Sequence, residues 1–261
     1  DILRDSGLPL NQHKLITSDD PEMVLKLVIN YRGLEILSFT GSLQVGKMIA
    51  QHILNSSNPF IRQIYELGDN SVMYVSEYAD IKKAAKIALG AFSNSGQRCT
   101  SIKMILLNNK IAKDFMNNFT SLTKKLRCGN PLNPATDIGT LIDENAAIQV
   151  QKRVNDAVSD GARLVIGNLR EGALYIPTIL DRVSLRSSLV TEETFGPVAP
   201  VIRVNSIKQA IKIVNNSTYG LAGCIATEKK EEATFYFESI NVGQFNWNHQ
   251  PGFRFEHAPF G

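Results

Sequence analysis

The sequence predicts an α/β fold, in which helices cover a mainly parallel sheet. Short apolar runs rich in Val, Ile and Leu, typical of buried strands, alternate along the chain with longer segments that have helical periodicity. This alternation is typical of right-handed crossover units. With 261 residues, 43% of them hydrophobic, the chain can bury a sizeable core in one large or two small domains.

The first predicted unit is a strand, a turn and a helix. Residues 34–39 have the composition of a strand, and residues 45–54 have the apolar spacing of a helix. Ser42 stands just before that helix and is a plausible N-cap. Two further β-rich runs follow, at 61–67 and 72–75.

The same alternation continues to the end of the chain. Further strands are predicted at 103–107, 163–166, 198–204, 221–226 and 242–245. Further helices are predicted at 81–92, 111–126, 147–158, 207–215 and 228–240. The dipeptide Asp160-Gly161 has the composition of a helix C-cap and ends the third of these helices.

Composition excludes several classes of partner. The formal charge is +3, from 28 basic and 25 acidic residues, and no dense Lys/Arg run appears, so we expect no nucleic-acid binding. No stretch of about 18 apolar residues is present, so we expect no membrane partner. The three cysteines Cys99, Cys128 and Cys224 are widely spaced, which indicates neither disulfides nor a zinc site and favours a reducing cytoplasm.

Two residues carry the candidate chemistry. Cys99 follows Gly96 and Arg98 in a polar turn, and a cysteine beside a cation can form a reactive thiolate. Glu66 ends an apolar run, and a carboxylate opposite a thiol can release a thioester by hydrolysis. On residues alone, a small buried core role is the more ordinary interpretation of Cys99. A surface ion pair is the less favoured alternative for Glu66, because Leu67-Gly68 follows it.

A glycine-rich turn precedes the first predicted helix. Residues 41–47 have the glycine spacing and the lysine of a phosphate-binding loop. Met48 stands where that loop needs a hydroxyl for magnesium, so an NTPase is excluded. Backbone N–H groups at a helix N-terminus still suit a dinucleotide pyrophosphate, with an ordinary capped helix as the alternative.

Three motifs resemble those of one enzyme family. The segment 92–100 looks like the cysteine signature of the aldehyde dehydrogenase superfamily, and 66–68 looks like its glutamate signature. The segment 192–198 resembles its cofactor-ribose motif. The resemblance implies a partial Rossmann-type cofactor domain at 1–67 and an α/β catalytic domain at 68–261. It also implies a fragment that lacks the N-terminal part and the C-terminal tail of a homo-oligomeric enzyme.

The resemblance implies an activity and a set of site residues. The complete enzyme would oxidise a small-molecule aldehyde to the carboxylic acid through a cysteine thioester, with NAD or NADP as cofactor. Cys99 would be the nucleophile, and Glu66 would activate the deacylating water. Residues expected to contact the cofactor are Gly41, Ser42, Leu67, Glu193 and Phe195. Of these, Glu193 would hold the nicotinamide ribose and Phe195 would pack near the nicotinamide.

Arg98 and Thr100 are the expected substrate-binding residues. The motif Gly-Gln-Arg-Cys-Thr at residues 96–100 resembles the corresponding motif of family members that handle phosphorylated or phosphonylated aldehydes. In those members a guanidinium binds the anionic end of the substrate. An ordinary ion pair of Arg98 is an equal alternative. Phosphonoacetaldehyde dehydrogenases give the nearest match, supported by residues 170–175 and by 251–261. Nonphosphorylating glyceraldehyde-3-phosphate dehydrogenases are similar too, and no metal site is expected.

Asp69 departs from the family pattern, which has a second glycine at this position. A side chain there is expected to crowd the nicotinamide, or a charge there to disfavour ionisation of Glu66. This departure supports a rival function for the chain, as a noncatalytic, truncated relative that acts as a binding or assembly module.

Overall fold

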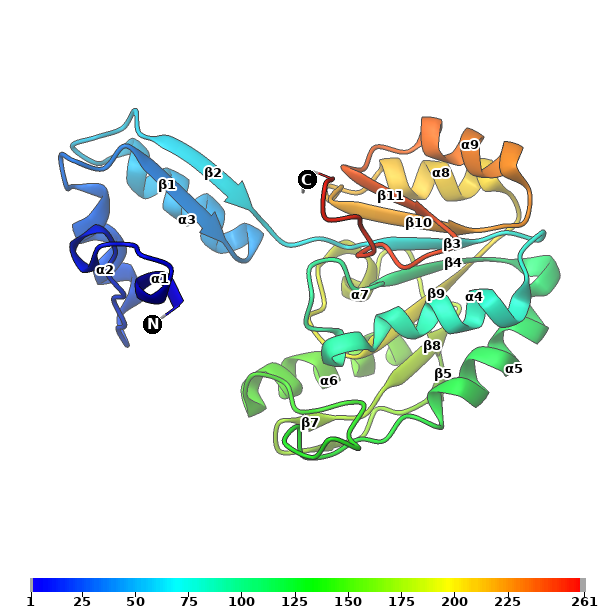
Figure 1. Cartoon of the computed structure of the whole chain (residues 1–261). Helices are drawn as coiled ribbons and strands as arrows, with labels where there is room; N and C mark the ends of the chain where they lie inside the picture. The colour runs from blue at the N-terminus through cyan, green and yellow to red at the C-terminus, as the bar shows by residue number, and fades with distance from the viewer. Residues whose placement is uncertain (1, 259–261) are drawn as a thin grey trace. The chain divides into compact units, whose positions relative to one another are not determined.

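The computed structural model describes residues 2–258, which divide between Leu67 and Gly68 into two compact units (Figure 1). Residues 259–261, which belong to one of the segments used for the subgroup match, lie outside the described part. The predicted α/β class is confirmed, because parallel strands alternate with helices in both units.

The first unit contains a two-stranded parallel sheet. Its elements in chain order are α1 (Ile2–Asp5), η1 (Leu10–Gln12), α2 (Pro21–Ile29), β1 (Ile36–Thr40), α3 (Leu43–Leu54) and β2 (Arg62–Glu66). The predicted N-cap is confirmed, since the Val45 N–H donates to Ser42 Oγ at 3.2 Å. Ile29, Ile49 and Ile53 form most of its small buried core.

The second unit is built on a seven-stranded sheet. The strands are β3 (Val72–Val75), β4 (Met104–Asn108), β5 (Arg163–Ile166), β8 (Thr178–Asp181), β9 (Val198–Val204), β10 (Ala222–Ala226) and β11 (Gln244–Trp247). Their order is β11-β10-β3-β4-β9-β8-β5, and only the β5 to β8 pairing is antiparallel. A short hairpin, β6 (Arg170–Glu171) with β7 (Leu174–Tyr175), lies outside it.

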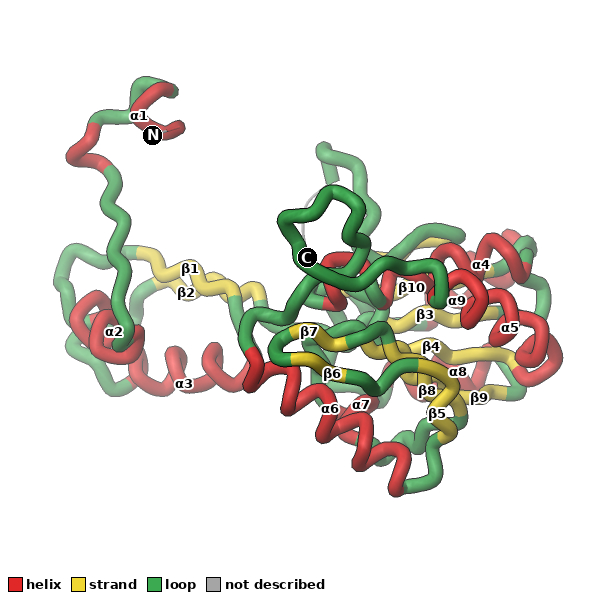
Figure 2. The backbone as a smooth tube through the Cα atoms, turned by 90° about the horizontal axis from the view of Figure 1, so that it is seen from below, coloured by secondary structure: helices red, strands yellow, loops and turns green. Residues whose placement is uncertain are grey.

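Helices cover both faces of this sheet (Figures 1 and 2). One face packs against α4 (Ile81–Ala88) and α5 (Ala112–Thr123). The other packs against α6 (Glu144–Ser159), α7 (Ser188–Thr191), α8 (Ile207–Asn215) and α9 (Lys230–Ser239). The 3₁₀ turns are η2 (Leu89–Ala91), η3 (Ser93–Gly96) and η4 (Asn109–Ile111). Because side chains alternate along a strand, β3 and β4 contribute to both cores and are buried on both sides.

No helix within residues 2–258 has the length and apolar character that crossing a bilayer requires. The bounds of β3, β5, β9 and α8 are those predicted from the sequence, whereas β8 and α2 were not predicted.

Candidate active site

Cys99 lies in the loop that joins α4 to β4, and its side chain is partly exposed. Before it the backbone is left-handed at Asn94 (φ 56°), Ser95 (φ 56°) and Gly96 (φ 69°). A Cβ atom on Gly96 would lie 2.0 Å from the backbone oxygen of Gly196. Only glycine therefore allows the cysteine loop to approach the segment after Glu193 this closely.

Side chains of the loop fix it to residues 139–142. Ser95 Oγ donates to the Gly139 carbonyl and accepts from the Gly139 N–H, both at 3.1 Å. The Gln97 amide donates to the Thr140 carbonyl at 3.2 Å and accepts from the Ile142 N–H at 2.9 Å. These bonds hold the residues before Cys99 in their strained conformation.

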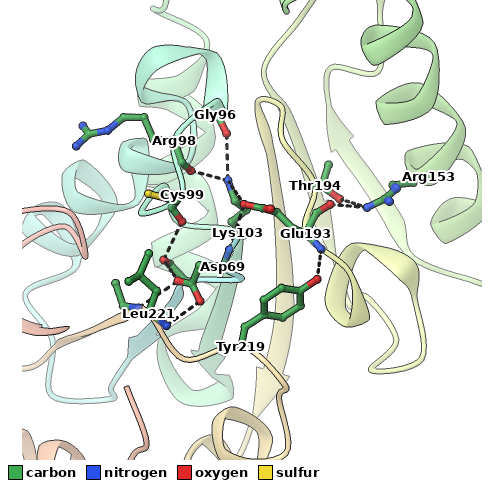
Figure 3. Close-up of polar contacts among 12 residues, drawn as sticks. Asp69, Gly96, Arg98, Cys99, Lys103, Arg153, Glu193, Thr194, Tyr219 and Leu221 are labelled. Carbon is green, nitrogen blue, oxygen red and sulfur yellow. Dashed lines mark hydrogen bonds and ion pairs between the residues drawn. The ribbon is translucent and has the colours of Figure 1, made fainter. Parts of the chain in front are cut away.

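Lys103 lies beneath the loop, just before β4, with a side chain that is 2% exposed. Its ammonium donates to the carbonyls of Gly96 at 3.2 Å and Arg98 at 2.8 Å, and lies 3.9 Å from Glu193 Oε1 (Figure 3). Burial lowers the pKa of Lys103 to about 8, although Glu193, Asp69 and Cys99 oppose this shift by charge attraction.

The Glu193 carboxylate is largely buried beside Lys103. It accepts the Asp69 N–H at 3.2 Å, and burial raises the pKa of Glu193 despite the nearby ammonium. The Glu193 N–H donates to the Tyr219 hydroxyl at 3.2 Å, and Arg153 donates to the Glu193 carbonyl at 2.7 Å. Backbone and side chain are therefore both held in place (Figure 3).

Phe195 presents an aromatic face beside this cluster. Its side chain is 47% exposed, and the Lys103 ammonium lies 4.8 Å from the ring centroid. Gly68 leaves space for the neighbouring carboxylate, because a Cβ there would lie 2.0 Å from Glu193 Oε2. The unit thus brings the cysteine signature and the predicted ribose motif together.

Asp69 is engaged by other groups of the protein rather than pointing freely from the loop. Its carboxylate accepts from the N–H groups of Leu221 (3.1 Å) and Ala222 (3.2 Å) and from the Ser71 hydroxyl. Burial raises the pKa of Asp69, and these hydrogen bonds oppose that shift. The carboxylate that was expected to crowd the cofactor therefore anchors the start of β10.

The other predicted residues of the first unit gather at one end of its sheet. Thr40 is the register partner of Glu66, and the Gly41 N–H donates to the Glu66 carbonyl at 3.0 Å. Leu67 packs against α3, where a Cβ on Gly46 would lie 2.6 Å from Leu67 Cδ2. Glu66 and Cys99 belong to different units, so their pairing stays a prediction.

Arg98 lines a cavity of about 480 Å³. The other lining residues are Lys86, Ile87, His249, Gln250, Gly252 and Phe253. Figure 3 shows the Arg98 side chain directed away from Lys103 and Glu193. Thr100 is buried beside Gly252, where a Cβ would lie 2.5 Å from Thr100 Oγ1. Within residues 2–258, no cluster of His, Cys, Asp or Glu side chains could hold a metal ion.

Lys103, Arg153 and Tyr219 are site residues that the sequence patterns did not predict. Lys103 carries a signal, since it is a lone charge at the start of the apolar run Ile102 to Leu107. A charge in such a position is rarely buried without a partner. Arg153 and Tyr219 have no such local signal.

The model of the "Aldehyde dehydrogenase family" matches residues 1–261. The chain belongs to the aldehyde dehydrogenase family. A lactaldehyde dehydrogenase of Methanococcus aeolicus is 34% identical over 261 residues, which are 100% of this chain and 55% of the relative. A 3-sulfolactaldehyde dehydrogenase of Priestia aryabhattai is 34% identical over 263 residues, 100% of this chain and 54% of the relative.

Solved structures of the same family share the fold. An NADP-dependent glyceraldehyde-3-phosphate dehydrogenase from Bacillus halodurans, complexed with NADP, superposes with a TM-score of 0.92 and 34% identity. The similarity covers 99% of this chain and 53% of that chain. This aldehyde dehydrogenase chain thus spans about half the length of the relatives that it matches.

Proposed function

We propose that this chain carries the catalytic cysteine of an NAD(P)-dependent aldehyde dehydrogenase, which oxidises an aldehyde to the carboxylic acid. The observation that carries this proposal is the cluster around Lys103. It joins the loop of Cys99 to Glu193, 94 residues later in the sequence, with two charged groups held in a largely buried site. Charges with shifted pKa values beside a partly exposed thiol are typical of catalytic sites.

The residues present suit a dinucleotide. Glu193 offers a fixed carboxylate to a ribose hydroxyl, the exposed face of Phe195 offers a stacking surface, and Gly68 leaves room for that carboxylate. In the first unit, α3 begins at Leu43 with first-turn N–H groups that suit a phosphate. The chemistry that a bound nicotinamide would supply is the acceptance of a hydride.

The protein's own groups supply the covalent steps. The Cys99 thiolate forms a carbon–sulfur bond with the aldehyde carbon, and the backbone N–H of Cys99 stabilises the resulting oxyanion. After oxidation the acyl group is held on Cys99 as a thioester. Glu66 takes a proton from water, the hydroxide adds to the acyl carbon, and the carbon–sulfur bond breaks to release the acid.

We further propose that the preferred aldehyde carries an anionic end. Arg98 enters a cavity that also contains Lys86 and His249, so this cavity is rich in groups that attract a phosphate, phosphonate or sulfonate. The names of two similar proteins, for 3-sulfolactaldehyde and for glyceraldehyde-3-phosphate, support this class. Phosphonoacetaldehyde, predicted from the sequence, is a third member of it.

The test compares 3-sulfolactaldehyde with lactaldehyde, which differ by the sulfonate alone. NADH and NADPH formation is followed by absorbance for wild type, Cys99→Ser, Arg98→Ala and the exposed control Arg186→Ala. Activity that Cys99→Ser abolishes supports the thioester route, and equal rates in both would overturn it. Arg98→Ala should lower kcat/KM for the sulfonate by about tenfold or more and spare lactaldehyde. An equal loss on both substrates would refute the anion-binding role.

A glyceraldehyde-3-phosphate dehydrogenase of the nonphosphorylating type is the second candidate. Its support is the solved NADP complex named for that reaction, at a TM-score of 0.92. Adding glyceraldehyde 3-phosphate to the same substrate panel separates the two candidates, because the true substrate should have the highest kcat/KM.

A further inference from the structure

A buried lysine with several polar partners lies at the centre of the candidate site. The side chain of Lys103 comes from the residue before β4 and is enclosed by the sheet and the cysteine loop. Its burial costs free energy, because an ammonium loses its hydration. The contacts of the Lys103 ammonium therefore indicate why it is buried.

Its shortest contacts are with the cysteine loop. The ammonium donates to the carbonyls of Gly96 and Arg98, at 3.2 and 2.8 Å, which are three residues and one residue before Cys99. The same stretch contains left-handed backbone at Asn94, Ser95 and Gly96. Left-handed backbone of this kind needs outside contacts to hold it, and Lys103 anchors the carbonyl of Gly96, which ends the left-handed stretch, and that of Arg98 two residues later.

Its remaining contacts are with the predicted ribose motif. The ammonium lies 3.9 Å from Glu193 Oε1 and 4.8 Å from the centre of the Phe195 ring. It therefore joins two segments that the chain separates by almost a hundred residues. If its role were only to neutralise Glu193, a shorter ion pair would be expected in place of the two carbonyl contacts.

We propose that Lys103 is a positioning residue of this site, which holds the cysteine loop against the Glu193 carboxylate and so sets both thiol reactivity and cofactor affinity. The part of this proposal that concerns cofactor affinity rests on the proposed function. The part that concerns the reactivity of the Cys99 thiol can be tested without turnover. Removal of the cation should make Cys99 less reactive, because the ammonium and the thiolate attract each other. It should also remove one of the two groups that orient the Glu193 carboxylate, the other being the Asp69 N–H.

The test of thiol reactivity treats the 261-residue chain with iodoacetamide. Mass spectrometry measures alkylation of Cys99 relative to Cys128, which lies in another part of the same unit and serves as an internal reference. In Lys103→Met the ratio should fall by at least about threefold at pH 7, and Lys103→Arg should restore most of it. The exposed control Lys208→Met should match wild type.

The test of cofactor affinity measures KM for NAD⁺ and NADP⁺. Lys103→Met should raise KM by at least about fivefold, more than it lowers kcat, because a misoriented Glu193 weakens binding first. An unchanged Cys99 to Cys128 ratio in a folded Lys103→Met protein would overturn the proposal. If that variant does not fold, Lys103→Gln decides the question in the same way. Absence of turnover in wild type would reject the proposed function, while the alkylation ratio still tests Lys103.

Discussion

Buried charged groups at the two ends of the seven-stranded sheet differ in how their pKa values are shifted. At the amino ends of β3, β4 and β9, Asp69, Lys103 and Glu193 all have pKa values shifted toward the neutral form, chiefly by burial. At the carboxyl end of β8, burial also raises the pKa of Asp181, but hydrogen bonds and charge from Arg203 reverse the shift and lower it. At the end of β8 the partner therefore keeps Asp181 charged, whereas the three groups at the amino end are shifted toward neutrality, as is typical of catalytic sites.

The largest effect on stability is expected from removal of the paired carboxylate. Asp181 accepts from Arg203 Nε at 2.7 Å and from Arg203 Nη2 at 3.0 Å, and Arg203 is itself largely buried. Asp181→Asn should lower the free energy of unfolding by about 3 kcal/mol, because a buried guanidinium loses its counter-charge. Urea unfolding measures this, with Asp137→Asn in an exposed pair expected to cost less than about 1 kcal/mol. Equal losses of unfolding free energy in the two variants would show that the buried pair stabilises the fold no more than the exposed pair does.

The second prediction concerns the strained loop at the amino end. Gly96→Ala places a Cβ on the Gly196 carbonyl in a left-handed conformation, so it should cost about 2–3 kcal/mol and slow alkylation of Cys99. Gly161→Ala is the matched control, since Gly161 is also left-handed (φ 96°) but has open space around it. That control should cost about 1 kcal/mol, and a similar loss in both variants would mean that the close approach carries no weight.

The third prediction is a pH dependence at the amino end. The pKa of Lys103 is about 8 in the folded protein and 10.5 as its ordinary value, so between these the unfolded chain holds more protons. Stability should therefore rise with pH, by about 2 kcal/mol from pH 8 to pH 10 relative to Lys103→Met. Thermal unfolding of wild type, Lys103→Met and Lys208→Met across this range checks it. Parallel curves for all three would contradict it.

The smallest expected effect contrasts two buried aspartates in acid. Asp181, with a lowered pKa, stabilises the fold above its ordinary pKa of 3.8, and this stability is lost as pH falls through its folded pKa. Asp69, with a raised pKa, does the opposite, because its contribution is complete below 3.8 and is lost as pH rises. Acid titrations of stability should be shallower than wild type for Asp181→Asn and steeper for Asp69→Asn, by about 1 kcal/mol.

Local patterns predicted most of the fold. Buried strands such as β9 and amphipathic helices such as α8 have a period that can be read within ten residues. The strand β8 was missed because its four residues follow directly after Pro177, which breaks the apolar run. The helix α2 was also missed, although Asp20 caps it and Pro21 begins it.

The site was only partly predictable, for a different physical reason. Cys99 and Glu193 stand in recognisable motifs, but the contacts that unite them depend on side chains distant in sequence. Arg153 reaches Glu193 across 40 residues and the Asp69 N–H reaches it across 124. No periodicity records such pairings, since they follow from the sheet order.

Gly68 has a consequence for how this protein tolerates change. The space that its missing side chain leaves is filled by the Glu193 carboxylate, and Gly68 is also the first residue of the second unit. Any larger residue there would push the acidic group out of place, because its Cβ would lie 2.0 Å from Glu193 Oε2. The position of the Glu193 carboxylate, which we propose to hold the ribose, therefore depends on a methyl group that is absent 125 residues earlier in the sequence.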